Sequence, residues 1–396
     1  MTRDPRAPKE DPRLARIRGD HEKRRPGARQ IAGLLDNPGC VRRQVVELSR
    51  TDPRELSRKA GVPPKFGQSP FAISTGNRIE ELAKRGSNYD KLLAVLRAEC
   101  DLPVSASRIE DLNDIGVSGM DADTRLRLRV RRTEHLLQAI VERRPDAPTI
   151  IDHPVLTLSV AGVTVYLEPD ALVALVIEDR LLLLEIKSFP VVDGQADTDK
   201  TTDAARQLAV YVLAARELIA RLGGDPGMVS DGPLLVTPRN TSLSDLTANP
   251  IPVRRLVAHL SRALRRVEKV DEILASLPVG FTLDPVTDAH NSGADATQAT
   301  AAALMRIDAN YLPECRSRCD LGEFCHRQHR DQQSPAVLGR SARDTLAGVP
   351  TFTAAVRIAN SAARPDDTAG PGVADALRRA ADAERAATDL INRRRA

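Results

Sequence analysis

The alternation of apolar and polar residues divides the chain into a helical first part, a strand-rich middle and a helical end. From Gln30 onward, apolar residues recur at the three- and four-residue spacing of a helix, interrupted by an Asn-Pro-Gly break at 37–39. In the segment 69–86 we expect a helix that begins near Thr75 and ends before Gly86. Further segments with helical spacing are 88–99, 125–143, 203–223 and 252–276.

The pattern changes at residues 155–190, which are rich in β-branched and aliphatic residues. Short turn sequences interrupt this stretch at Ala161-Gly162 and at residues 178–180. We therefore predict three or four strands in a meander, and a further strand at 232–238. The sequence LLLL directly before Glu185 is typical of a central strand that is buried on both faces. The predicted fold class is α/β.

Composition and net charge limit which functions the chain can have. The chain has 396 residues, 41% of them hydrophobic, no Trp, 3% aromatic residues and a net charge of +4. A core must therefore be mostly aliphatic, and the mild basicity permits contact with nucleic acid without demonstrating it. We find no apolar run long enough for a membrane span and no secretory signal, and expect a cytoplasmic protein. Residues 1–30 are charged and contain few apolar positions, so we predict a disordered basic arm.

Three charged residues, Asp170, Glu185 and Lys187, lie within this apolar stretch. Glu185 and Lys187 are two residues apart on one strand, so their side chains share a face of the sheet. A neighbouring antiparallel strand would bring Asp170 beside Glu185. Two adjacent carboxylates suit Mg²⁺ or Mn²⁺, and a lysine on the same face can stabilise developing negative charge. This combination predicts metal-dependent hydrolysis of phosphodiesters.

Further residues extend this group in a fixed order along the chain. Gly76-x-x-x-Glu80 precedes it, and Gln207-x-x-x-Tyr211 follows it on one face of a predicted helix. The ordered set resembles the RecB-like branch of the PD-(D/E)xK nucleases.

The resemblance implies a restriction-endonuclease-like mixed sheet flanked by helices. It also implies metal ligation by Asp170, Glu185 and the Ile186 carbonyl, with a catalytic Lys187. Gln207 and Tyr211 would contact DNA or steady the site. The branch usually has His where this chain has Glu80, which is also an oxygen ligand and a candidate metal residue.

Three of the five cysteines, Cys315, Cys319 and Cys325, lie within eleven residues. Converging thiolates require a soft metal, and Cys40 upstream offers a fourth ligand. This arrangement resembles the iron–sulfur nucleases of the RecB-like branch, namely the CRISPR-associated exonucleases and the AddB-type nuclease domains. The resemblance implies a [4Fe–4S] cluster on these four cysteines. Three residues separate Cys315 from Cys319 here, whereas two residues usually separate the corresponding cysteines in these nucleases. Zinc on Cys315, Cys319, Cys325 and His329 is the alternative.

The resemblance covers about residues 36–330. We accordingly expect a basic arm over 1–30, a nuclease domain over 31–330 and a helical tail over 331–396. The expected activity is that of a DNA nuclease, acting as an exonuclease on single strands or DNA ends, in phage defence or DNA repair. Its expected partners are DNA and a helicase or another defence protein. The alternatives are a zinc-containing nucleic-acid-binding protein and a catalytically inactive nuclease fold that serves as a partner subunit.

Overall fold

The chain forms two compact units, and each is described by itself. The first comprises Met1–Asp52 and Gln68–Asp284, and the second comprises Pro53–Gly67 and Pro285–Ala396. The computed structural model describes residues 11–64, 70–86, 88–103, 108–113, 115–117, 119–175, 178–240, 242, 245–267, 269–285, 293–361 and 371–395. The division at Pro285 differs from the boundary at residue 331 that the sequence suggested, since the cysteine-rich segment belongs to the same unit as the tail.

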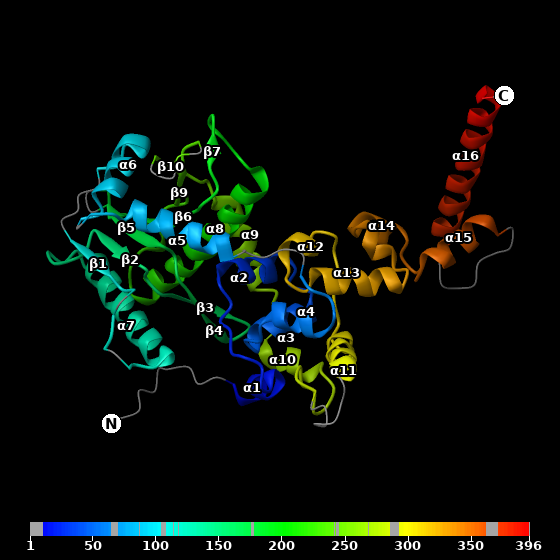
Figure 1. Ribbon diagram of the computed structural model, residues 1–396, viewed down its shortest axis with the longest axis horizontal. Helices are drawn as coiled ribbons and strands as arrows, with labels where there is room; N and C mark the ends of the chain where they lie inside the picture. Colours follow the sequence, from blue (N-terminus) through cyan, green and yellow to red (C-terminus); the bar gives the residue numbers. More distant parts are fainter. Residues whose placement is uncertain are drawn as a thin grey trace. The chain divides into compact units, whose positions relative to one another are not determined.

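The first unit is built on an open, mixed sheet of six strands with helices around it (Figure 1). The order across the sheet is β1-β2-β5-β6-β9-β10, in which the β1–β2 and β6–β9 pairs are parallel and the other pairs are antiparallel. These strands are β1 (Ile109–Asp111), β2 (Ile150–Asp152), β5 (Ala171–Leu175), β6 (Arg180–Ile186), β9 (Leu234–Pro238) and β10 (Leu246–Pro250). The mixed α/β class is as predicted.

Two small hairpins lie outside this sheet. They are β3 (Leu156–Val160) with β4 (Val163–Leu167), and β7 (Val191–Val192) with β8 (Gln195–Ala196). The first hairpin turns at Ala161 and Gly162, both with positive φ (55° and 83°), as two-residue hairpin turns require. The predicted meander over 155–190 therefore contains four strands, but they belong to two sheets.

Helices of the first unit cover the sheet and extend beyond it. They are α1 (Pro12–Arg18), α2 (Ala28–Asp36), α3 (Val41–Leu48), α5 (Pro70–Ala83), α6 (Asp90–Cys100), α7 (Ala122–Val141), α8 (Thr198–Arg221), the 3₁₀ turn η1 (Pro226–Met228), α9 (Arg254–Leu264) and α10 (Val270–Ala275). Asp residues cap the two longest, since Asp121 accepts the Thr124 amide and Asp197 accepts those of Asp199 and Lys200.

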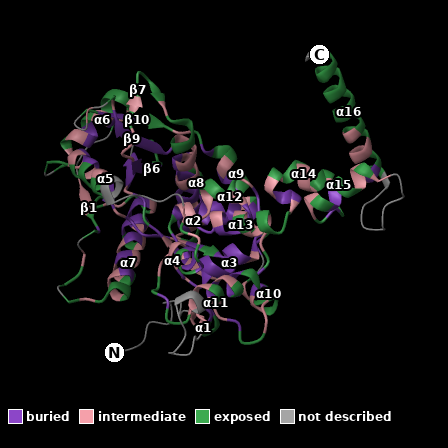
Figure 2. Ribbon diagram, turned by 45° about the vertical axis from the view of Figure 1, so that its right-hand side comes forward, coloured by how far each residue is buried: buried purple, intermediate pink, exposed green. Residues whose placement is uncertain are grey.

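The position of β6 in the centre of the sheet explains its apolar sequence. Leu182, Leu184 and Ile186 pack in one core with residues of α5 and α6. Because side chains alternate along a strand, Leu181 and Leu183 point to the opposite face, and helix α8 contacts β6. Both faces are thus buried, as Figure 2 shows in purple for β6. Glu185 shares the face of Leu183.

Several elements differ from the sequence-based expectations. Residues 11–30 of the predicted disordered arm contain α1 and the start of α2, and bury Leu14 and Ile17. The predicted helix over 252–276 is two helices, α9 and α10, and the helix expected from Thr75 begins at Pro70. Strands β1, β2 and β10 were not predicted, because two of them have only three residues and give no recognisable alternation.

The second unit is helical over the residues that the structure describes. Its elements are α4 (Pro53–Lys59), α11 (Gly293–Met305), α12 (Cys315–Arg318), α13 (Gly322–Asp331), the 3₁₀ turn η2 (Pro335–Leu338), α14 (Arg340–Thr345), α15 (Phe352–Asn360) and α16 (Pro371–Arg395). Helices α15 and α16 share a small apolar cluster that includes Val349, Ala354 and Ala355. Residues 382–393 of α16 are all exposed (Figure 2).

Candidate metal-dependent active site

The β5–β6 hairpin brings the two predicted carboxylates together. Its register pairs Ala171 with Leu184, so Asp170 and Glu185 occupy the next position on the two strands. Asp170 Oδ2 accepts a hydrogen bond from the Ile186 amide at 2.5 Å. Burial, followed by the negative charges of Glu185 and Glu80, raises the pKa of Asp170 to about 8. The two carboxylates therefore repel each other in a place with little water.

Lys187 lies directly beside Glu185. Its ammonium donates to Glu185 Oε1 at 2.5 Å and to Gln207 Oε1, on α8, at 3.0 Å. Burial opposes the charge of Lys187, but Glu185 and Asp170 outweigh it and raise its pKa. Lys187 is therefore a fixed cation, which suits stabilisation of negative charge and does not suit proton abstraction. Gln207 holds this cation in place.

The turn before Asp170 is held from two sides. Tyr211, on α8 and only 6% exposed, donates its hydroxyl proton to the Glu168 carbonyl at 3.1 Å. Arg129, on α7, pairs with Glu168 Oε2 at 2.9 Å and also donates to the His153 carbonyl at 2.9 Å. Of the two roles expected for Tyr211, steadying the site agrees with its burial, whereas contact with DNA does not.

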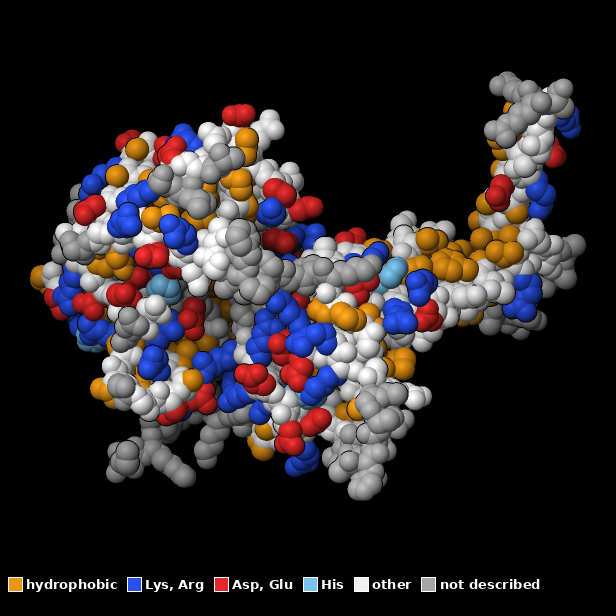
Figure 3. Space-filling view, in the orientation of Figure 1, with side chains coloured by type: hydrophobic (Ala, Val, Ile, Leu, Met, Phe, Trp, Pro, Cys, Tyr) orange, Lys and Arg blue, Asp and Glu red, His pale blue; other side chains and the backbone are white. Residues whose placement is uncertain are grey.

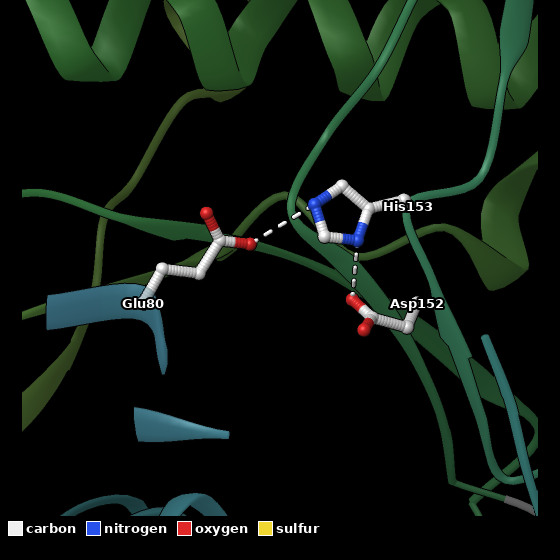
Figure 4. A group of neighbouring side chains, drawn as sticks. All are labelled: Glu80, Asp152 and His153. Carbon is white, nitrogen blue, oxygen red and sulfur yellow. Dashed lines mark ion pairs between the residues drawn. The ribbon is translucent and has the colours of Figure 1, made fainter. Parts of the chain in front are cut away.

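Glu80 extends from α5 to a second group of charged residues at the end of β2. His153 lies between two carboxylates, with Nε2 at 3.0 Å from Glu80 Oε1 and Nδ1 at 3.1 Å from Asp152 Oδ1 (Figure 4). The Nδ1 contact is an ion-pair contact and lacks hydrogen-bond geometry. Burial opposes protonation of His153, but Asp152 and Glu80 raise its pKa to about 9. The imidazole is therefore a cation near neutral pH.

Lys84 and Tyr89 complete this second group. The Lys84 ammonium donates to Asp152 Oδ1 at 2.5 Å, to Glu80 and to the Asp170 carbonyl at 3.0 Å. Tyr89 donates to the other Asp152 oxygen at 2.5 Å. Asp152 is 2% exposed, and its pKa is lowered because His153 and Lys84 outweigh the cost of burial. The groups of Asp170 and of Asp152 thus meet at Glu80 and at the Asp170 backbone.

The second group was missed in the sequence, where we expected nothing of Asp152 or Lys84. A signal exists: Asp152 and His153 directly follow the apolar pair Ile150 and Ile151, as Asp170 and Lys187 border apolar strands. Charged residues at the end of a buried strand need partners, so the two positions carry the same kind of signal.

The donor set at Asp170 and Glu185 fits a hard divalent cation. Glu185 is 4% exposed, and its Oε2 atom is buried without a hydrogen-bond partner. A buried carboxylate oxygen in this state is costly unless a cation completes its coordination. Asp170, Glu185 and Glu80 supply the oxygen ligands that Mg²⁺ and Mn²⁺ prefer. For Ile186, the amide contacts Asp170, and ligation by its carbonyl stays a prediction.

The cysteines fall in both units. Cys40 caps α3 in the first unit, while Cys315, Cys319 and Cys325 lie at the start of α12, at its end and within α13. The close approach of α12 and α13 requires Gly322, since a Cβ atom there would lie 2.1 Å from the Cys315 carbonyl oxygen. Ligation of a [4Fe–4S] cluster by the four cysteines stays a prediction.

The zinc alternative draws its ligands from the second unit alone. There His329 stacks on Tyr311 with ring centroids 5.1 Å apart, and the Tyr311 hydroxyl contacts His326 Nδ1 at 2.9 Å. Burial and the neighbouring Cys315 raise the pKa of Tyr311 to about 12. His329 thus lies on the same helix as Cys325. The [4Fe–4S] cluster and the zinc site would share the same three thiols and differ in the fourth ligand.

Comparison with known proteins gave no relative: no protein-family model, curated protein or solved structure matches this chain. Among the described residues, the helices all fall short of the length and apolar character that a membrane span needs. The geometry of the site and the resemblance of its motifs are therefore the basis for inferring a function.

Proposed function

We propose that this protein is a metal-dependent nuclease that hydrolyses phosphodiester bonds of DNA. The observation that carries the proposal is the juxtaposition of Asp170 and Glu185 on adjacent strands, with a buried, unpartnered oxygen on Glu185 and the ammonium of Lys187 beside it. The order of these residues along the chain supports the same conclusion through its resemblance to RecB-like nucleases.

Charge balance supports a phosphodiester as the substrate. With Asp170 ionised, four carboxylates (Glu80, Asp152, Asp170 and Glu185) face three cations, namely Lys84, His153 and Lys187. The site then carries one net negative charge, and a divalent cation changes this to one net positive charge. A phosphodiester, with its single negative charge, would complete the balance.

The bound cation would supply Lewis acidity to the phosphate and lower the pKa of a water molecule. Within the chain, Asp170 and Glu185 would hold that cation, and the Ile186 amide orients Asp170. Lys187, fixed by Gln207, would stabilise the negative charge that develops on phosphorus oxygens as water attacks and the P–O ester bond breaks. Tyr211 and Arg129 would keep the turn before Asp170 in position.

Both signs of charge are interspersed over the visible face of the first unit (Figure 3). This face offers no extended positive field, so contact of a DNA strand with it would depend on individual basic residues. The [4Fe–4S] cluster proposed for Cys40 and the three C-terminal cysteines would be structural and would take no part in the hydrolysis.

The test is cleavage of end-labelled single-stranded DNA by anaerobically purified protein with Mn²⁺. We expect wild-type protein to degrade the label, and Lys187→Ala and Glu185→Gln to lower the rate by at least about 100-fold, as loss of a charge-stabilising group does. Lys200→Ala is the matched control, because Lys200 is an exposed lysine at the start of α8. Equal, background rates for all four proteins would reject the nuclease and favour an inactive partner subunit.

Metal analysis of the same sample separates the cluster from zinc. Iron and sulfide in a brown protein would support the cluster, while zinc alone in a colourless protein would support the nucleic-acid-binding alternative.

A further inference from the structure

Lys84 lies beside the three residues of the second charged group that could together hold a metal ion. Glu80, Asp152 and His153 each offer a ligand atom, and these atoms all lie within 4.8 Å of one another, which is an arrangement that can hold a cation. The Lys84 ammonium contacts two of the three residues, Asp152 Oδ1 at 2.5 Å and Glu80 Oε1. The Lys84 side chain is only 9% exposed, so its ammonium lies among these residues and does not extend into water.

The group already contains a cation without any metal. The Lys84 ammonium faces both of its carboxylates, Glu80 and Asp152. Each oxygen of Asp152 also has a hydrogen-bond donor, since Oδ1 accepts from Lys84 and Oδ2 accepts from Tyr89. A divalent ion entering this group would meet the Lys84 ammonium at close range, and the repulsion between the two charges is strong in a partly buried site.

The group around Asp170 contrasts with it. There Asp170 and Glu185 share one cation, Lys187, and a buried oxygen of Glu185 has no hydrogen-bond partner. The two groups adjoin, since Lys84 also donates to the Asp170 carbonyl at 3.0 Å. The Asp152 group therefore has a lysine in contact with both of its carboxylates, whereas the Asp170 group leaves a buried carboxylate oxygen open to a cation from solution.

We propose that the Lys84 ammonium is the resident cation of the Glu80–Asp152–His153 group and that it excludes a second divalent ion there. This inference rests on the proposed function, and it deepens it: the site works with one divalent ion, and a lysine takes the place of a second. Lys84 is a positioning residue, because it acts through Glu80 and the Asp170 backbone.

The experiment counts bound Mn²⁺ by electron paramagnetic resonance in EDTA-washed holoprotein at pH 8. We expect one site in wild-type protein and two in Lys84→Met, which keeps the length of the side chain and removes its charge. Lys84→Ala is the second variant, in case one of them folds poorly, and Lys200→Ala is the control with one site. Adding Asp152→Asn to Lys84→Met should return the count to one.

Two Mn²⁺ sites in wild-type protein, or a single site in both folded Lys84 variants, would overturn the inference. Failure of the proposed function gives a different result, namely no Mn²⁺ bound to wild-type protein. A site that then appears in Lys84→Met and disappears with Asp152→Asn would still support the role of the lysine. The readout is stoichiometry, so it does not depend on cleavage activity.

Discussion

Replacing Asp170 with Asn should stabilise the metal-free protein, and increasingly so as the pH rises. Burial and the charges of Glu185 and Glu80 raise the pKa of Asp170 from an ordinary value of 3.8 to about 8. In the folded chain this carboxyl is therefore protonated at pH 7, while in the unfolded chain it is ionised. A raised carboxyl pKa lowers the free energy of unfolding. This penalty is absent below pH 3.8 and grows until the pH reaches about 8.

The size of the effect follows from the pKa difference. Each pH unit between these two values costs about 1.4 kcal/mol, so the penalty at pH 7 has an upper limit of about 4 kcal/mol. Relaxation of the folded chain and entry of water reduce this cost. We expect Asp170→Asn to gain about 1–3 kcal/mol at pH 7 and close to nothing at pH 4. The Ile186 amide can still donate to the side-chain oxygen of the new asparagine.

The assay is urea unfolding in EDTA, followed by circular dichroism at several pH values from 4 to 8. Glu81→Gln is the control, because Glu81 is an exposed carboxylate next to Glu80 and should show no growing difference. Mn²⁺ at 100 times its Kd should add about 2.7 kcal/mol to wild-type protein and almost nothing to Asp170→Asn. A difference between Asp170→Asn and wild type that stays constant over this pH range would refute the reasoning.

Three further predictions address the supports of the site and the cysteine segment. Arg129→Lys keeps the charge but loses the two-point contact, so Mn²⁺ affinity should fall about 10- to 100-fold while kcat changes less; an unchanged Kd in a titration would count against a positioning role. Cys325→Ser should lose iron from anaerobically purified protein, whereas Cys100→Ser, whose thiol faces the first-unit core, should keep it; equal iron in both would rule out ligation by Cys325. Gly322→Ala should lower the melting temperature of the second unit sharply, because the added Cβ lies 2.1 Å from a backbone oxygen. The control, Gly372→Ala, lies in open space on a helix and should raise the free energy of unfolding by up to about 1 kcal/mol. Similar shifts for the two variants in differential scanning calorimetry would contradict this.

Sequence alone was sufficient for the central pair of carboxylates and the lysine. The apolar run before Glu185 predicted a central strand, and β6 indeed lies between β5 and β9. The two-residue period of a strand then put Glu185 and Lys187 on one face, and a short hairpin put Asp170 opposite Glu185. These contacts are local in sequence, so backbone geometry determines them.

Only the tertiary structure assigned partners to Glu80 and revealed Lys84, Asp152 and Arg129. Helix α5 and the end of β2 are about seventy residues apart, and the strand that carries Asp152 has three residues, too few for a readable pattern. The same holds for α1, whose Leu14 and Ile17 are buried although the surrounding sequence is charged. Local sequence patterns determine the face of a helix or strand on which a side chain lies. Its ion-pair partners on distant elements depend on how those elements pack, and that packing is determined by the whole core.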